Sequence, residues 1–186
     1  MDGDGRVDLA SFGLGHVRIW KNDGAGAWPV LAEWTTPPRG YFAAFRVGGD
    51  ADHNGYADLA IVAEEGSGLN SRNRLRFYRE ASVPAALDVR VVRPGRLARL
   101  RGGEVTFIEW AAAVPGGADS RATLAYSLTG PAGPWTTIAS RIANDGSYQW
   151  VAPDAVSNDL RVRVTVVSGG AHASATSGRL RVLAGH

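Results

Sequence analysis

Oxygen-bearing side chains stand at regular intervals in the segment DADHNGYAD, residues 50–58. They occupy its first, third, fifth and ninth positions, as Asp50, Asp52, Asn54 and Asp58. Ca²⁺ is a hard cation that binds several oxygen ligands in a flexible shell, and alternate residues of a tight loop can direct their oxygens to one centre. The spacing therefore predicts a calcium site in this loop.

The remaining positions of the loop fit the same interpretation. Gly55 permits the sharp turn, and the backbone carbonyl of Tyr56 falls at the seventh position. An EF-hand needs a bidentate glutamate at position 12, where this sequence has Ile61, and no helical pattern flanks the loop. We therefore expect a calcium loop between strands. The alternative is that the Asx-Gly pairs only build turns, since Asn and Asp side chains hydrogen-bond their own backbone without a metal.

The same pattern occurs a second time near the N-terminus. Residues 4–10, DGRVDLA, match residues 54–60, NGYADLA, at an offset of 50 residues. This earlier copy offers the later positions of the loop: Asp2, Asp4, Arg6 and Asp8. Its first position would fall before Met1, so we expect a second, incomplete site that binds calcium weakly or not at all unless a residue outside this sequence completes it.

Short strands must position these loops. Runs of β-branched and aromatic residues bounded by Gly, Pro, Asn or Asp predict strands at residues 8–12, 17–20, 30–34, 41–47, 59–63 and 75–78. A repeat near fifty residues, with several short strands and Gly-rich turns in each unit, is typical of β-propeller blades. The first half is therefore predicted to be all-β.

Residues 2–80 resemble FG-GAP or VCBS repeats, the blades of integrin-α-like propellers. The two loop and Asp-Leu-Ala stretches carry this resemblance, with support from IWKNDGAGAW at residues 19–28. It implies metal loops that stiffen the blades and a propeller that binds proteins or glycans. A closed propeller needs at least about four blades. Only one complete repeat and part of another are visible, so we expect partial propeller blades with exposed strand edges over residues 1–80.

The second half has a different pattern. After a linker at residues 81–87, strands are predicted at residues 88–92, 105–110, 123–128, 135–139, 148–151, 160–167 and 179–183. The clearest is LRVRVTV at residues 160–166, where apolar and polar residues alternate as in a strand with one buried face. Residues 88–186 are therefore predicted to form an immunoglobulin-like or fibronectin-like β-sandwich.

Aromatic residues recur along these predicted strands: Trp110, Tyr126, Trp135, Tyr148 and Trp150. They could form a sugar-binding platform, but their places in alternating strands favour core packing. Residues 88–183 also resemble a bacterial Ig-like module related to the Kre9/KNH type. GEVTFIEW at residues 103–110, GPW at 133–135 and GSYQWVAP at 146–153 carry that resemblance. It implies a spacer or interaction module without a shared active site.

Composition limits the partners of the 186-residue chain. The net charge is +2, but the arginines alternate with apolar residues as on a solvated strand face, and no nucleic-acid motif accompanies them. Nucleic acid is therefore not an expected partner. No apolar run is long enough to span a bilayer, and we expect an export signal upstream of this sequence. The absence of cysteine excludes disulfides and thiolate metal sites.

Catalytic motifs are missing from the sequence. None of the histidines, His16, His53, His172 and His186, lies in a nucleophile, zinc or phosphate motif, and His172 is expected in a turn. Glu33 and the pair Glu64-Glu65 could supply carboxylates for glycoside hydrolysis, but solvated loop charges are the favoured interpretation. We therefore expect no enzyme.

These observations predict a non-catalytic, bacterial, extracellular or surface-displayed calcium-binding protein, present as a fragment. Its expected role is adhesion, with a protein or glycan ligand at a cell surface or in the extracellular matrix. The alternative is a pair of accessory, carbohydrate- or substrate-binding modules of a larger secreted hydrolase. A third possibility is a carbohydrate-binding module that acts through exposed aromatic residues: Trp20, Trp28, Trp34 and Tyr41.

Overall fold

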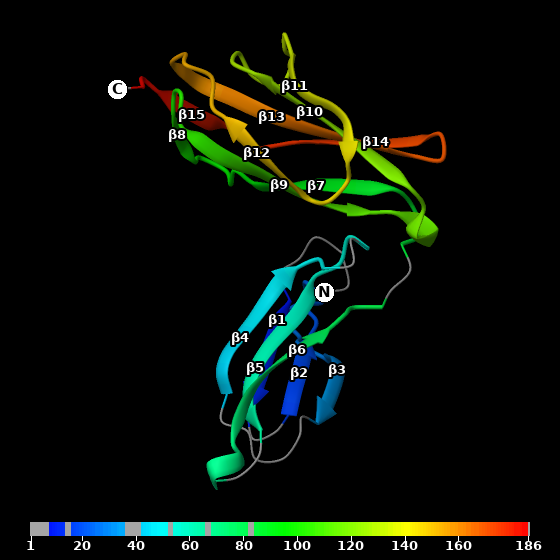
Figure 1. Cartoon of the computed structure of the whole chain (residues 1–186). Coiled ribbons are helices and arrows are strands. Elements are labelled where there is room, and N and C mark those ends of the chain that lie inside the picture. The colour runs from blue at the N-terminus through cyan, green and yellow to red at the C-terminus, as the bar shows by residue number, and fades with distance from the viewer. Residues whose placement is uncertain are drawn as a thin grey trace. The chain divides into compact units, whose positions relative to one another are not determined.

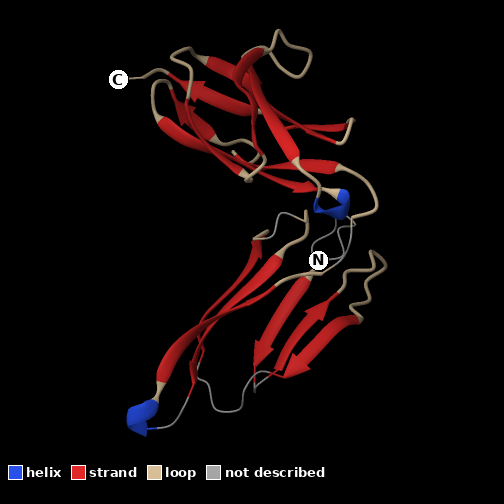
Figure 2. Ribbon diagram, turned by 45° about the vertical axis from the view of Figure 1, so that its right-hand side comes forward, coloured by secondary structure: helices blue, strands red, loops and turns tan. Residues whose placement is uncertain are grey.

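A computed structural model of the chain describes residues 8–13, 16–35, 42–51, 54–65, 68–81 and 84–185. Within these residues the structure is built from β-strands, with single-turn 3₁₀ helices at Gly68–Asn70 (η1) and Pro115–Gly117 (η2) (Figure 2). The predicted all-β class is confirmed. No helix in this described part has the length and apolar character that crossing a bilayer requires.

The chain divides into two compact units. The first comprises Met1–Asp52 and Tyr56–Ser82, and the second comprises His53–Gly55 and Val83–His186. The main division, between Ser82 and Val83, falls inside the segment 81–87 that the sequence marks as a linker. We describe each unit separately.

The first unit contains two antiparallel sheets of three strands each (Figure 1). Sheet A consists of β1 (Leu9–Gly13), β2 (His16–Trp20) and β3 (Val30–Thr35), in that order. Sheet B consists of β4 (Phe42–Gly49), β5 (Asp58–Glu65) and β6 (Arg72–Tyr78), also in chain order. Every strand that the sequence predicts in the first half is present within one to three residues of its predicted ends.

The two sheets share one apolar core. Val17 of sheet A is buried with Leu59 and Ile61 of sheet B. Aromatic pairs flank this contact: the Phe12 and Phe45 rings stack with centroids 5.7 Å apart, and the Trp34 and Tyr78 rings lie 5.2 Å apart. Since each pair joins a residue of sheet A to one of sheet B, the sheets are successive layers packed face to face.

The internal repeat is preserved in the strand register. In sheet A, Leu9 lies opposite Trp20 on the neighbouring strand, and in sheet B, Leu59 lies opposite Tyr78. Both leucines follow the last aspartate of their loop copy. The sequence repeat is therefore also a repeat of hairpin geometry.

The second unit is a two-layered β-sandwich. One layer has the strand order β12-β9-β7, formed by β7 (Asp88–Arg93), β9 (Val105–Ala113) and β12 (Ser147–Val151). The other has the order β11-β10-β13-β15-β8, and β14 also pairs with β13. Its strands are β8 (Arg99–Arg101), β10 (Ser120–Ser127), β11 (Thr136–Ala143), β13 (Ser157–Ser168), β14 (Ala171–Thr176) and β15 (Leu180–Leu183).

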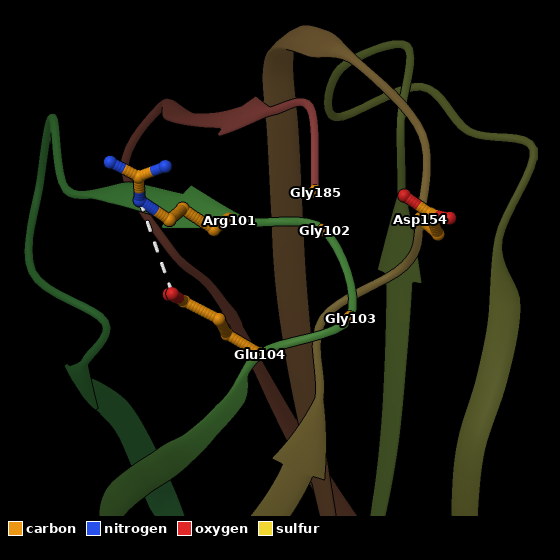
Figure 3. A pocket seen from close by; sticks show the side chains of 6 residues that line it. All are labelled: Arg101, Gly102, Gly103, Glu104, Asp154 and Gly185. Carbon is orange, nitrogen blue, oxygen red and sulfur yellow. Dashed lines mark ion pairs between the residues drawn. The ribbon is translucent and has the colours of Figure 1, made fainter.

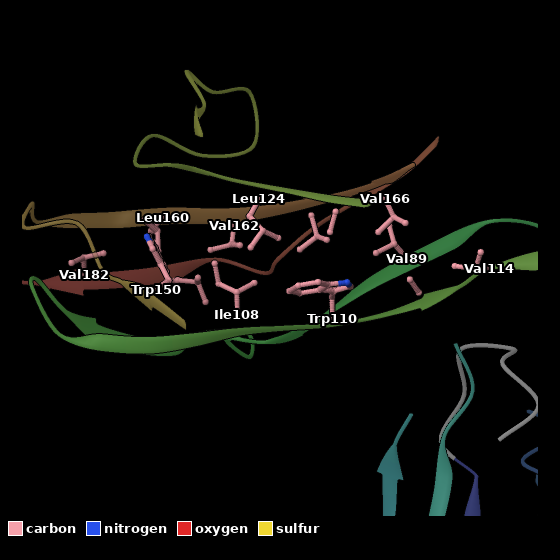
Figure 4. Packing of buried hydrophobic residues seen from close by; sticks show 14 residues of the cluster. Val89, Ile108, Trp110, Val114, Leu124, Trp150, Leu160, Val162, Val166 and Val182 are labelled. Atoms are coloured by element: carbon pink, nitrogen blue, oxygen red, sulfur yellow. The ribbon is translucent and has the colours of Figure 1, made fainter. Parts of the chain in front are cut away.

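The sandwich core follows from the alternation along β13. Leu160, Val162 and Val164 are fully buried, as the two-residue period of a strand with one covered face requires. They face apolar side chains of the other layer, among them Ile108 and Trp110, and Figure 4 shows these residues lying between the two layers. Full burial of each such aliphatic side chain contributes roughly 1.5–3 kcal/mol. The immunoglobulin-like sandwich is confirmed.

Two strands of the sandwich were not predicted, β8 and β14. The prediction of His172 in a turn is also wrong, because it lies in β14 opposite Val167. Gly169 and Gly170, with φ values of 55° and 88°, make the turn instead and return the chain onto β13. The segment AHASAT has few β-branched residues, so its strand conformation comes from pairing with β13 rather than from local propensity.

Candidate functional site

Asp58 joins three segments of the first unit. It is the first residue of β5 and only 4% exposed. Its Oδ2 atom accepts a 2.6 Å hydrogen bond from the backbone N–H of Ala51, and its Oδ1 atom accepts one of 2.9 Å from the N–H of Glu80. The carboxylate therefore holds the start of the predicted calcium loop and the residue that follows β6 by two positions.

Asp8 makes the corresponding contact in the first copy of the repeat. Its Oδ1 atom accepts a 3.0 Å hydrogen bond from the backbone N–H of Asn22. Asn22 follows Trp20 by two residues, as Glu80 follows Tyr78, and these aromatic residues are the strand partners of Leu9 and Leu59. Both aspartates thus have the same structural role, which is to fasten the end of the neighbouring strand.

The other predicted ligands are described in part. Asp50, Asn54 and Tyr56 are half-buried, and each interacts with another residue. Gly55 has φ of 90°, in the left-handed region, as a sharp turn requires. The predicted ligands Asp52, Asp2, Asp4 and Arg6 lie outside the described residues. Among those that are described, no group of three or more His, Asp or Glu side chains is arranged to hold a metal ion.

The chemistry around Asp58 is compatible with Ca²⁺. A carboxylate offers about four acceptor sites, of which the two backbone N–H groups use two. No described Lys, Arg or His side chain forms an ion pair with it. A buried carboxylate is stabilised by a cation or further donors, and carboxylate, amide and carbonyl oxygens are the ligands that calcium prefers. The donor set of the loop therefore fits this ion.

Two of the glutamates considered for catalysis, Glu33 and Glu65, belong to ion pairs on strands. Glu33, on β3, lies 3.0 Å from Arg18 Nη2 and 3.2 Å from His16 Nδ1. Glu65, at the end of β5, lies 2.6 Å from Arg76 Nε. In each case the hydrogen bond from the arginine lowers the pKa of the carboxyl group. The prediction that these glutamates lie in loops is therefore wrong, since Glu33, Glu64 and Glu65 are all strand residues.

Two of the sandwich tryptophans belong to the core, as predicted. Trp110 and Trp150 are buried, and the Trp110 Nε1–H donates a 2.6 Å hydrogen bond to Asn144 Oδ1. Trp135 differs because it is only half-buried and packs outside the core. The Arg163 guanidinium carbon lies 4.2 Å from its ring centre, in a cation–π contact.

The aromatic residues of the first unit have separate environments. Trp34 packs against Tyr78, and Trp20 donates a 2.8 Å hydrogen bond from Nε1 to Ser11 Oγ. Trp28 is 40% exposed, whereas Tyr41 lies outside the described residues. Trp34 is thus used for packing between the sheets.

A hollow of about 430 Å³ lies at one end of the sandwich (Figure 3). Three charged side chains and three glycines line it: Arg101, Gly102, Gly103, Glu104, Asp154 and Gly185. Arg101 Nε and Glu104 Oε1 are 3.9 Å apart, and the three charged residues are exposed. A Cβ atom on Gly102 would lie 2.7 Å from Asp154 Oδ1. The hollow is therefore lined by close-packed turns with exposed charged side chains.

Comparisons with known proteins gave a family match within the first unit and a structural similarity over most of the chain. A family model described as FG-GAP-like repeat matches residues 1–61. No curated protein matches the chain. A solved structure, described as fibronectin(III)-like modules of CbhA from Clostridium thermocellum, is similar with 13% sequence identity and a TM-score of 0.39, over 91% of this chain and 84% of that one.

The fold and the family match together define the class of this protein. It is an all-β protein. It joins a region similar to FG-GAP repeats to an immunoglobulin-like β-sandwich.

Proposed function

We propose that this protein is a non-catalytic, calcium-binding interaction protein of the cell surface or extracellular space. Ca²⁺ binds the loop from Asp50 to Asp58 and stiffens the blade-type sheets. These sheets form part of a propeller and, with the sandwich, contact a protein or glycan ligand in adhesion.

The observation that carries the proposal is the environment of Asp58. Its buried carboxylate has acceptor capacity left after the bonds from Ala51 and Glu80, and it closes a loop rich in oxygen donors. A cation there acts on three connected segments, namely the loop, β5 and the residues after β6. Calcium therefore stabilises sheet B as a whole, and not only the loop.

The sandwich contributes spacing or presentation. Its core aromatic residues are used for packing, and the hollow at its end has exposed charged walls that include the Arg101–Glu104 pair. These features favour a spacer or interaction module, in line with the resemblance to the Kre9/KNH-type module.

Calorimetric calcium titration and thermal melts in calcium and in chelator test the proposal. A ligand that binds the native state at about 100 times its Kd raises stability by about 2.7 kcal/mol, so calcium should raise the melting temperature of the wild-type chain. Asp50→Ala and Asp52→Ala should remove this shift and the binding heat.

Asp23→Ala is the matched control. The Asp23 carboxylate also shapes a turn, through hydrogen bonds from the N–H groups of Ala25 and Ala27, but it lies outside the loop. Its calcium response should equal that of the wild type. If the wild-type chain gives no heat and no shift, the loops are plain turns and the proposal fails.

A further inference from the structure

Each sheet of the first unit has two faces, and the repeat makes them comparable between sheets. Alternate strand residues point to opposite sides, and directly paired residues point to the same side. We call the front face of sheet A the side formed by Ala10, Phe12, Val17 and Ile19. The repeat assigns the front face of sheet B to Ala60, Val62, Leu75 and Phe77, which are paired in the same register.

The opposite sides are the back faces. In sheet A the back face includes Leu9, Ser11, Arg18 and Trp20, with Glu33 of β3 opposite Arg18. In sheet B it consists of Leu59, Ile61, Arg76 and Tyr78. The core of the unit is therefore a contact between unlike faces, because Phe12 and Val17 of the front face of sheet A pack on Leu59, Ile61 and Tyr78 of the back face of sheet B.

The front face of sheet B has apolar residues at the same positions, and those of its edge strand β6 are exposed. Val17 and Ile19 are 0% and 6% exposed in sheet A. Leu75 and Phe77, at the corresponding positions of sheet B, are 57% and 61% exposed. Sheet B therefore presents in solvent the residue types that sheet A buries against a neighbouring sheet.

The back face of sheet A is exposed at a position where the back face of sheet B is buried. Leu59 of sheet B is 3% exposed beneath sheet A, whereas Leu9, its counterpart, is 50% exposed. Trp20 takes the position that Tyr78 has in sheet B. The Trp20 Nε1–H is already hydrogen-bonded to Ser11 Oγ, so covering this face leaves no indole donor without a partner.

We propose that the front face of sheet B binds the back face of sheet A in a second copy of this chain. The contact repeats between molecules the packing that joins the two sheets within one molecule. Because two different faces meet, the association is head-to-tail and continues into a ring or an open chain of copies. Ser11 stands where sheet B has Ile61, so the contact between molecules is less apolar than the internal one and reversible on dilution.

Two single-face variants of the full chain test this inference. Phe77→Asp places a charge on the front face of sheet B, and Leu9→Asp places one on the back face of sheet A. Sedimentation velocity over a wide concentration range should show association of the wild-type chain and only monomer for each variant alone. An equimolar mixture of the variants should form a heterodimer and nothing larger, since each retains the face that the other has lost.

Val156→Asp is the control, because Val156 is 69% exposed in the sandwich unit and should leave association unchanged. If Phe77→Asp lowers the melting temperature strongly, Leu75→Asp replaces it on the same face. A wild-type chain that stays monomeric at all concentrations overturns the inference. A mixture of the two variants that fails to associate also overturns it. So does loss of association in Phe77→Asp but not in Leu9→Asp, since the front face then binds itself or the sandwich unit. Sedimentation in calcium and in chelator separates the association of copies from calcium binding at the proposed metal site.

Discussion

The backbone N–H of Glu80 donates a 2.9 Å hydrogen bond to the Oδ1 atom of Asp58, across the end of the β5–β6 hairpin. Asn22 and Asp8 form the equivalent bond in the first repeat copy. An aspartate that ends each loop copy therefore closes the hairpin that follows it, and this role does not need a metal. The structural and the proposed metal-binding contributions of Asp58 can be separated by experiment.

Replacing Asp58 with alanine should destabilise the first unit even in chelator. The change leaves the N–H groups of Ala51 and Glu80 without their acceptor, and each such hydrogen bond contributes about 0.5–1.5 kcal/mol. Urea unfolding in excess chelator measures this loss. Asp23→Ala, which removes the acceptor of an exposed turn, should cost less. An Asp58→Ala chain as stable as wild type in chelator would falsify the structural role.

The ion pair of Glu65 should make the first unit sensitive to acid. Arg76 lowers the pKa of Glu65 in the folded state below its ordinary value of 4.5. The contribution of the pair is therefore fully present above that value and is lost as the pH falls through the lowered pKa. Thermal melts across the acid range should show a shallower acid loss for Glu65→Gln than for wild type. Glu64→Gln, on the opposite face of β5, should retain the wild-type slope.

Leu160→Ala should destabilise the sandwich by about 2–5 kcal/mol, because it removes a fully buried side chain and leaves a cavity between the two layers. Denaturant unfolding followed by tryptophan fluorescence measures this change, since Trp110 and Trp150 belong to the same core. Leu183→Ala, at a residue 41% exposed on β15, is the control and should cost much less. Equal losses for the two variants would contradict the assigned core.

Arg163 and Trp135 should be energetically coupled. The guanidinium lies 4.2 Å from the ring centre at a partly exposed site, where a cation–π contact contributes about 0.5–1 kcal/mol. A double-mutant cycle with Arg163→Gln and Trp135→Leu measures the coupling free energy. Additive effects of the two changes would show that the contact adds no stability.

Much of the strand content could be predicted because the signal is local. Alternation in LRVRVTV identified β13, and the Asp-Leu-Ala repeat identified β1 and β5. Strands without this signal were missed. The small residues of β14 become extended through hydrogen bonds to β13, a partner that local composition does not specify.

The sequence by itself determined the all-β class, the fifty-residue repeat and the oxygen-rich loops, because residue type and spacing along the chain carry this information. Only the tertiary structure decided that Asp58 binds the N–H of Glu80, and that Glu33 and Glu65 lie in arginine pairs. It also decided that Val17 is covered while its counterpart Leu75 is exposed. Hydrogen-bond partners and burial depend on which segments meet in space, and pairs so far apart in the chain are set by sheet packing rather than by local propensity.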